Sequence, residues 1–173
     1  MFKLPVPDII LKDIYRLKPE QLKEMGIKLL LMDLDNTLAK YSAVYPSVQL
    51  RNWIDGLKKA GIEPFIFSNT RSNRAEGFAK ALSIGYVNKA RKPKTELLKE
   101  ILRKKSISSE NTAIVGDQVY TDILCGVRAG IKTIAVMPID MKNPFHLFRY
   151  GAEMPFRYAY IRKSKKRKRK EGK

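Results

Sequence analysis

Short apolar runs alternate with amphipathic segments between Ile27 and Pro138, and this alternation restricts the fold more than any other feature of the sequence. The runs are short, apolar and rich in residues that favour strands, as is typical of strands buried on both faces. The predicted strands cover residues 27–34, 62–68, 84–88, 112–117 and 131–137. The pattern therefore predicts an α/β fold with a central parallel β-sheet flanked by helices.

Four segments between these strands place apolar residues at helical spacing. They predict helices over residues 47–61, 72–85, 94–106 and 120–130, and three of them end at a glycine, which commonly terminates helices. In the first helix, Trp53 belongs to a stripe of apolar residues. We expect this stripe and its counterparts in the other helices to pack in the core rather than to contact a ligand.

The composition predicts one domain followed by a charged tail. The chain has 173 residues, of which 44% are hydrophobic, and this is enough for a single domain over residues 1–160 with a substantial core. The net charge is +18, and residues 157–173 contain ten basic residues and one acidic residue. Such a block of like charge predicts a disordered tail over residues 161–173. Its partner would be an anionic membrane surface or nucleic acid, and a solubilising extension without a partner is the third interpretation.

The apolar pattern and the composition also exclude several classes of protein. No apolar run approaches the length of about 20 residues that a membrane-spanning helix needs, and Pro5, Pro7 and Asp8 interrupt the N-terminal segment where a signal sequence would be apolar. We therefore expect a cytoplasmic protein that can bind peripherally to the inner face of the membrane. One cysteine, Cys125, and one histidine, His146, exclude an internal disulfide and a Cys/His zinc site.

Two aspartates, Asp33 and Asp35, end the apolar run in the segment KLLLMDLDNTLAK. Two carboxylates at the end of a buried strand repel each other unless a cation lies beside them. Further polar residues follow the other predicted strands, and the carboxyl ends of parallel strands share one edge of the sheet. These residues are Ser68, Asn69, Thr70, Lys92, Asp117 and Asp122. Carboxylates without histidine favour a hard cation such as Mg²⁺, and a hydroxyl and a lysine nearby suit phosphoryl oxygens.

The segments DLDNTLA, FSNT, RKP and VGDQVYTDI resemble the four ordered motifs of the haloacid dehalogenase (HAD) superfamily, in its phosphatase branch. FSNTRSNRAEGFAKAL and GDQVYTDILCGVRAGIKTIAV resemble more narrowly the YqeG-type phosphatases of subfamily IIIA, which are similar to phosphatidylglycerophosphate phosphatases. The resemblance covers roughly residues 27–138. It implies a Rossmann-like HAD fold and hydrolysis of phosphoric monoesters through an aspartyl-phosphate.

The resemblance also implies a role for each polar residue at the predicted edge. Asp33 would be the nucleophile and Asp35 the general acid and then the general base. Ser68, Asn69 and Lys92 would bind the phosphoryl group, with Lys94 and Lys89 as alternatives for the lysine. The Mg²⁺ ligands would come from Asp33, the Asp35 backbone carbonyl and Asp117, and Asp122 would either ligate through water or orient Lys92. Thr37 would tie down the loop.

The connections at 38–67 and 69–91 leave no room for an inserted cap domain, and this favours a large or surface-bound substrate. The leading hypothesis is a Mg²⁺-dependent phosphatase that converts phosphatidylglycerophosphate to phosphatidylglycerol. The alternatives are a phosphatase for nucleotides or nucleic-acid ends, and an RNA- or ribosome-binding protein on a HAD scaffold. Residues 138–160 mix aromatic and basic side chains, which suits a membrane interface, a segment packed on the core, or base stacking.

Overall fold

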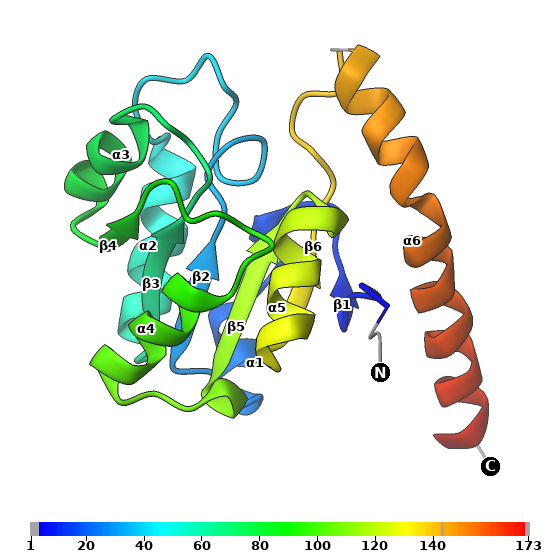
Figure 1. Cartoon of the computed structure of the whole chain (residues 1–173). Coiled ribbons are helices and arrows are strands. Elements are labelled where there is room, and N and C mark those ends of the chain that lie inside the picture. Colours follow the sequence, from blue (N-terminus) through cyan, green and yellow to red (C-terminus); the bar gives the residue numbers. More distant parts are fainter. Residues whose placement is uncertain (1–3, 143, 172–173) are drawn as a thin grey trace.

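Six parallel strands form one sheet in the computed structural model. The structure describes residues 4–142 and 144–171. It also describes the side chains of these residues, except those of 145, 146 and 163–171. The strand order is β1-β6-β5-β2-β3-β4 (Figure 1). The strands are β1 Ile9–Ile10, β2 Leu29–Met32, β3 Glu63–Phe67, β4 Gly85–Val87, β5 Thr112–Gly116 and β6 Lys132–Ala135. From β2 the chain continues outward through β3 and β4 and then returns to β5 on the other side of β2. The switch in strand order therefore lies between β2 and β5, where ligands bind in open α/β sheets.

Helices cover both faces of the sheet (Figure 1). Their bounds are α1 Pro19–Glu24, α2 Val48–Lys59, α3 Arg74–Leu82, α4 Glu96–Lys105, α5 Leu124–Ala129 and α6 Pro144–Glu171. Along β2, Leu30 and Met32 belong to the core cluster formed with α1, α2 and α3, whereas Leu29 and Leu31 belong to the cluster formed with α4 and α5. Successive side chains of a strand point to opposite faces, so a strand that is apolar throughout is buried on both faces.

The five predicted strands and the four predicted helices are all present, within a few residues of their expected ends. Trp53 packs in the core as expected, and its indole N–H donates a hydrogen bond of 2.9 Å to the carbonyl of Leu17. The expected helix over 120–130 divides into a π-helical segment, η3 Val119–Ile123, and α5. The sequence did not predict β1, which pairs with β6 over two residues, or α6. Among the described residues, the connections between β2, β3, β4 and α4 contain no inserted cap domain.

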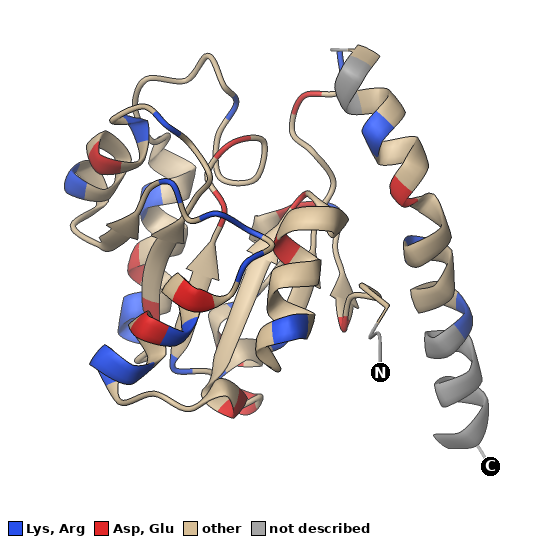
Figure 2. Ribbon diagram, in the orientation of Figure 1, with Lys and Arg blue, Asp and Glu red and all other residues tan. Residues whose placement is uncertain are grey.

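Helix α6 follows the β1 edge of the molecule and contacts β1 and η3 (Figure 1). It extends to Glu171 and so includes most of residues 161–173, which we expected to be disordered. Lysine and arginine have high helix propensity, so the segment can continue a helix that its first turns have already begun. Residues 172–173 lie outside the described part, and the division into a domain and a tail stays a prediction. Lys and Arg are distributed over many elements besides α6 (Figure 2).

None of the helices in the described ranges combines the length and the apolar character that crossing a bilayer requires.

Candidate active site

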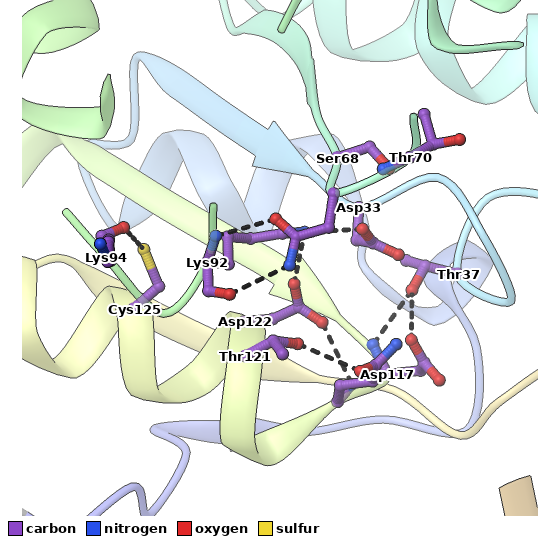
Figure 3. Close-up of polar contacts among 12 residues, drawn as sticks. Asp33, Thr37, Ser68, Thr70, Lys92, Lys94, Asp117, Thr121, Asp122 and Cys125 are labelled. Atoms are coloured by element: carbon purple, nitrogen blue, oxygen red, sulfur yellow. Dashed lines mark hydrogen bonds and ion pairs between the residues drawn. The ribbon is translucent and has the colours of Figure 1, made fainter. Parts of the chain in front are cut away.

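The predicted site residues converge where β2 and β5 lie next to each other. Asp33 directly follows β2, and its N–H donates a 3.0 Å hydrogen bond to the carbonyl of Val115 in β5. Asp117 directly follows β5, and Ser68 follows β3 on the other side of β2. The three loops therefore meet at the carboxyl edge of the sheet, at the switch in strand order, as the sequence predicted (Figure 3).

Three buried aspartates, Asp33, Asp117 and Asp122, form an acidic cluster at this edge. Each offers one oxygen atom, and these atoms all lie within 4.8 Å of one another. Burial, and then the charge of Asp33, raises the pKa of Asp117 well above its ordinary value. Burial also raises the pKa of Asp122, to about 6, although the nearby Lys92 opposes this shift. For both groups burial is the larger cause, because it disfavours the charged form of a carboxyl group, and the charge of Asp33 adds to the shift.

Lys92 supplies part of that positive charge. Its ammonium lies 2.6 Å from an oxygen of Asp33 and 2.6 Å from an oxygen of Asp122, and its side chain is 1% exposed. Burial alone would lower the pKa of Lys92, but the carboxylates of Asp122 and Asp33 raise it above its usual range. Lys89 and Lys94, the two alternatives, are exposed. Lys92 is thus the lysine that the fold brings to Asp33, and its contact with a phosphoryl group stays a prediction.

Asn69 holds the backbone of Lys92 in place. Its side-chain amide donates a 3.0 Å hydrogen bond to the Lys92 carbonyl and accepts a 2.8 Å bond from the Lys92 N–H. This pair of bonds was not foreseen, and it occupies the side chain that we expected to bind phosphate. Ser68 is buried beside the acidic cluster, and its Oγ accepts a 3.3 Å bond from the Thr70 N–H. Phosphate binding by Ser68 and Asn69 stays a prediction.

Asp122 is fixed through both of its oxygens, one by Lys92 and the other by the N–H of Gln118, which donates a 3.1 Å hydrogen bond. Its carboxyl group also lies directly against Gly116, where an added Cβ atom would come within 2.3 Å of it. Any larger residue at position 116 would displace Asp122. Of the two roles expected for Asp122, these contacts favour the orientation of Lys92. The π-helical segment η3, which carries Asp122, is a local distortion frequently found at functional sites.

Thr37 ties the loop after β2 to the loop after β5. The Asp117 N–H donates a 3.0 Å hydrogen bond to the Thr37 hydroxyl, which in turn donates a 3.3 Å bond to the Asp117 carboxylate. Asn36, next to Thr37, has a φ of 62°, in the left-handed region that asparagine tolerates better than most residues. The expectation that Thr37 fixes this loop is confirmed by these bonds.

Asp35 lies apart from the acidic cluster and pairs with Arg74 at the start of α3. The Arg74 Nε–H donates a 2.9 Å bond to Asp35, and the same guanidinium donates to the carbonyls of Lys40, Tyr41 and Ala43. Burial and the charge of Asp33 raise the pKa of Asp35, and Arg74 opposes the shift. A raised pKa suits a carboxyl group that must hold a proton before it donates it. Sequence reasoning missed Arg74 because it was counted only as part of a helix.

Helix α6 also reaches the site. The Nη2 of Arg149 lies 3.0 Å from an oxygen of Asp117, and the Nη2 of Arg157 donates a 2.8 Å bond to the Asp117 carbonyl. Arg157 is buried together with Glu153, its partner one turn earlier. No local pattern marked either arginine, because their partners lie 32 and 40 residues away in the sequence.

The donor set fits a divalent cation. Asp33 and Asp117 offer carboxylate oxygens close together, with no thiol or imidazole among the described residues of the cluster, and oxygen ligands are those of hard cations. Burial and the charge of Asp33 raise the pKa of Asp117, and a cation bound there would favour the charged form of this carboxyl group. The edge thus combines a candidate cation site, a buried lysine and a separate protonatable carboxyl group, which together can support phosphoryl transfer.

Comparisons with known proteins agree with this geometry. A family model described as "HAD-hyrolase-like" matches residues 89–138. The "Probable phosphatase YqeG" of Bacillus subtilis (strain 168) is 35% identical over 83% of this chain and 83% of its own length. The "Phosphatidylglycerophosphate phosphatase 1, chloroplastic/mitochondrial" of Arabidopsis thaliana is 33% identical over 81% of this chain, which spans only 43% of that protein.

Among solved structures, an uncharacterized protein from Listeria monocytogenes serotype 4b aligns with 68% of this chain and 85% of its own, with a TM-score of 0.55 and 18% identity. At that identity the likeness concerns the fold alone.

Proposed function

We propose that this chain, which belongs to the YqeG family of HAD-like phosphatases, is a Mg²⁺-dependent enzyme. Its proposed reaction is the dephosphorylation of phosphatidylglycerophosphate to phosphatidylglycerol. Hydrolysis of phosphoric monoesters follows from the family. The metal, the lipid and the roles of individual residues are the proposal.

One observation carries the mechanism: Lys92 and Asp117 flank the Asp33 carboxylate, while Asp35 is held away from it by Arg74. The Asp33 carboxylate is thus paired with a buried cation, while the Asp35 carboxyl group keeps a raised pKa. An Asp33 oxygen would attack phosphorus as the ester P–O bond breaks, and Asp35 would give its proton to the leaving oxygen. Asp35 would then take a proton from water, which attacks the aspartyl-phosphate and releases inorganic phosphate.

The residues suited to hold Mg²⁺ are Asp33 and Asp117. Bound there, Mg²⁺ would supply positive charge to the phosphoryl oxygens and the attacking carboxylate. The protein's own contribution is the placement of both carboxylates at adjacent strand ends, with Thr37 fixing Asp117. Lys92, which pairs with Asp33, would neutralise a phosphoryl oxygen that Mg²⁺ does not contact. Ser68, buried in the next loop, would donate a hydrogen bond from its hydroxyl to the same phosphoryl group.

The lipid substrate is supported by the surroundings of the site. The loop between β2 and α2 exposes Tyr41, Val44 and Tyr45, with 51%, 71% and 76% of their surfaces accessible. Burial, and then the charges of Asp35, Asp117 and Asp33, raises the pKa of Tyr41, so this loop begins beside the acidic cluster. At the start of α6, which carries Arg149, Phe148 is 77% exposed. Apolar and aromatic side chains exposed near a catalytic edge fit a membrane surface, and the strongly basic sequence after residue 161 fits anionic lipids.

The experiment that tests this proposal measures Mg²⁺-dependent phosphate release from phosphatidylglycerophosphate in anionic vesicles. A nucleotide and an RNA carrying a terminal phosphate are assayed in parallel as alternative substrates, and the Asp33→Asn protein is the blank. Preference for the lipid supports the proposal. Turnover of only the nucleotide or RNA would instead favour the nucleic-acid alternative, to which the net charge of +18 also fits.

A further inference from the structure

Arg149 is a second cation at the acidic cluster, and it comes from outside the four motif segments of the chain. It lies on α6, beyond residues 89–138 that match the family model. Its guanidinium pairs with Asp117 at 3.0 Å, where the Asp117 side chain is fully buried and the Arg149 side chain is 19% exposed. The Arg149 guanidinium is thus paired with a fully buried carboxylate, while part of the Arg149 side chain reaches solvent.

The placement of Arg149 is fixed by the contacts of the next two turns of α6. Residues 149, 153 and 157 are spaced by four and so share one face of the helix. Arg157 donates hydrogen bonds to the carbonyls of Asp117 and Val136, at 2.8 and 3.3 Å, and pairs with the buried Glu153. Tyr120, in η3, adds a 3.0 Å bond from its hydroxyl to the carbonyl of Ala152. The helix that presents Arg149 is therefore attached to the same loop that carries Asp117.

Arg149 is incompletely satisfied where it lies. Its Nε atom is buried and has no hydrogen-bond partner among the described residues. A guanidinium offers five donors in a planar fork that matches carboxylate and phosphate groups, so its capacity exceeds the single contact with Asp117. The charge of Arg149 also lowers the pKa of the Tyr41 hydroxyl, although burial and three aspartates raise it more strongly.

A cation bound by Asp117 would compete with Arg149 for the same carboxylate. Two positive groups near one carboxylate repel each other, so a cation bound by Asp117 would make the Arg149 donors available to another anion. In the proposed mechanism, Lys92 would contact the reacting phosphoryl group beside Asp33. Arg149 would therefore bind a second anionic group of the substrate. This group would lie nearer to solvent than the reacting phosphorus.

We propose that Arg149 is a specificity-determining residue that binds a second phosphoryl anion of the substrate, a few atoms away from the monoester that is cleaved. The inference rests on the proposed phosphatase function and narrows its substrate class to phosphomonoesters with a neighbouring phosphodiester or second phosphate. Both a lipid headgroup of this type and the phosphorylated end of a nucleic acid have this chemistry. An arginine suits such a group because it binds phosphate through two parallel hydrogen bonds.

The test compares the full-length protein with Arg149→Gln, and uses Arg103→Gln, an exposed arginine on α4, as the matched control. Three soluble substrates are used with Mg²⁺: the deacylated headgroup of phosphatidylglycerophosphate, an oligonucleotide with a 3′-phosphate, and phenyl phosphate. The quantity measured is kcat/KM for each two-anion substrate divided by kcat/KM for phenyl phosphate. In Arg149→Gln this ratio is expected to fall about tenfold or more, mainly through KM, as for loss of a charge-assisted hydrogen bond. Arg103→Gln keeps the ratio, and Arg149→Lys recovers part of it.

A fall for the headgroup alone identifies the lipid as the source of the second anion, and a fall for the oligonucleotide alone identifies nucleic acid. An equal loss on all three substrates overturns the proposal, because Arg149 would then serve only Asp117. If the wild-type protein hydrolyses no phosphomonoester, the proposed function fails instead. Calorimetric binding of the headgroup to Asp33→Asn and to Asp33→Asn/Arg149→Gln then decides the inference, and equal affinities overturn it.

Discussion

The ammonium group of Lys92 lies 2.6 Å from a carboxylate oxygen of Asp33, although 59 residues separate the two in the sequence. The same ammonium contacts Asp122 at 2.6 Å, so one buried cation bridges two buried anions that follow different strands. Burial of three charged groups in this way requires each to be paired, since an unpaired buried charge is strongly destabilising. The bridge therefore supports both the fold and the chemistry of the site.

Replacement of Lys92 by methionine is expected to destabilise the metal-free protein by about 3–5 kcal/mol, because it leaves Asp33 and Asp122 buried without their cation. Urea unfolding in the presence of a chelator measures this loss. Lys94→Met is the control, since Lys94 is exposed two residues away. Equal stability of the two variants would show that the bridge does not contribute. Mg²⁺ is expected to restore part of the stability of Lys92→Met, because it neutralises Asp33.

Arg74→Gln is expected to impair the cleavage of poor leaving groups more than that of good ones. Arg74 holds both Asp35 and the carbonyls of the adjoining loop, so its loss would displace the proposed general acid. An alkyl phosphate needs a proton on its leaving oxygen, whereas a nitrophenyl phosphate does not, and we expect kcat to fall about tenfold more for the former. Steady-state kinetics on both esters measures the difference.

Arg71→Gln serves as the control for Arg74, because it removes an exposed arginine three residues earlier. The same loss of kcat on both esters in Arg74→Gln would mean that Arg74 acts on the fold or on binding rather than on the general acid.

The sheet and its flanking helices could be predicted because their signals are local. Continuous apolar runs marked β2 and β5, and the carboxyl ends of parallel strands share one edge, so the meeting of Asp33 and Asp117 follows from strand order alone. By contrast, β1 has two residues and depends on its pairing with β6. A strand that short carries no periodicity for a sequence pattern to show.

The contacts that complete the site could not be predicted, because they join residues that lie far apart in the sequence. Arg74 reaches Asp35 across 39 residues, and Arg149 reaches Asp117 across 32. Nothing in the neighbouring sequence distinguishes these arginines from the exposed basic residues of a chain with 35 lysines and arginines. Helix α6 was missed because the block of like charge after residue 161 argues for disorder, and the mixed aromatic and basic residues before it fit several interpretations. The helix is held in place by long-range contacts, such as the bond from the buried Arg157 to the Asp117 carbonyl.

Cys125 is expected to be inert in the folded protein. The side chain is buried between α5 and the sheet, its thiol donates a bond of 3.3 Å to the Lys94 carbonyl, and burial raises its pKa to about 12. A raised thiol pKa leaves almost no thiolate at pH 8, and thiolate is the reactive form. A chromogenic disulfide reagent should therefore react at pH 8 only after the protein is unfolded in urea. Rapid labelling of the folded protein would contradict the packing of this face.

Deletion of residues 163–173 is expected to reduce hydrolysis on anionic vesicles more than hydrolysis of a soluble phosphate ester. The segment contains eight of the chain's basic residues and one acidic residue, and each basic residue near an anionic surface contributes about 1 kcal/mol of attraction. Vesicle assays at low and physiological salt measure the effect, which should shrink as salt screens the charges. An equal loss on both substrates would indicate that the segment serves folding or the site itself.

Phosphate release from phosphatidylglycerophosphate in vesicles, measured with and without Mg²⁺ for the wild-type protein and for Asp33→Asn, tests the proposed phosphatase most directly. The substitution is nearly isosteric and removes the proposed nucleophile, so we expect a folded variant with no turnover and a wild-type protein whose turnover requires Mg²⁺. Circular dichroism checks that the variant is folded. Turnover retained by Asp33→Asn, or by the wild-type protein after removal of all divalent cations, would contradict the proposed mechanism.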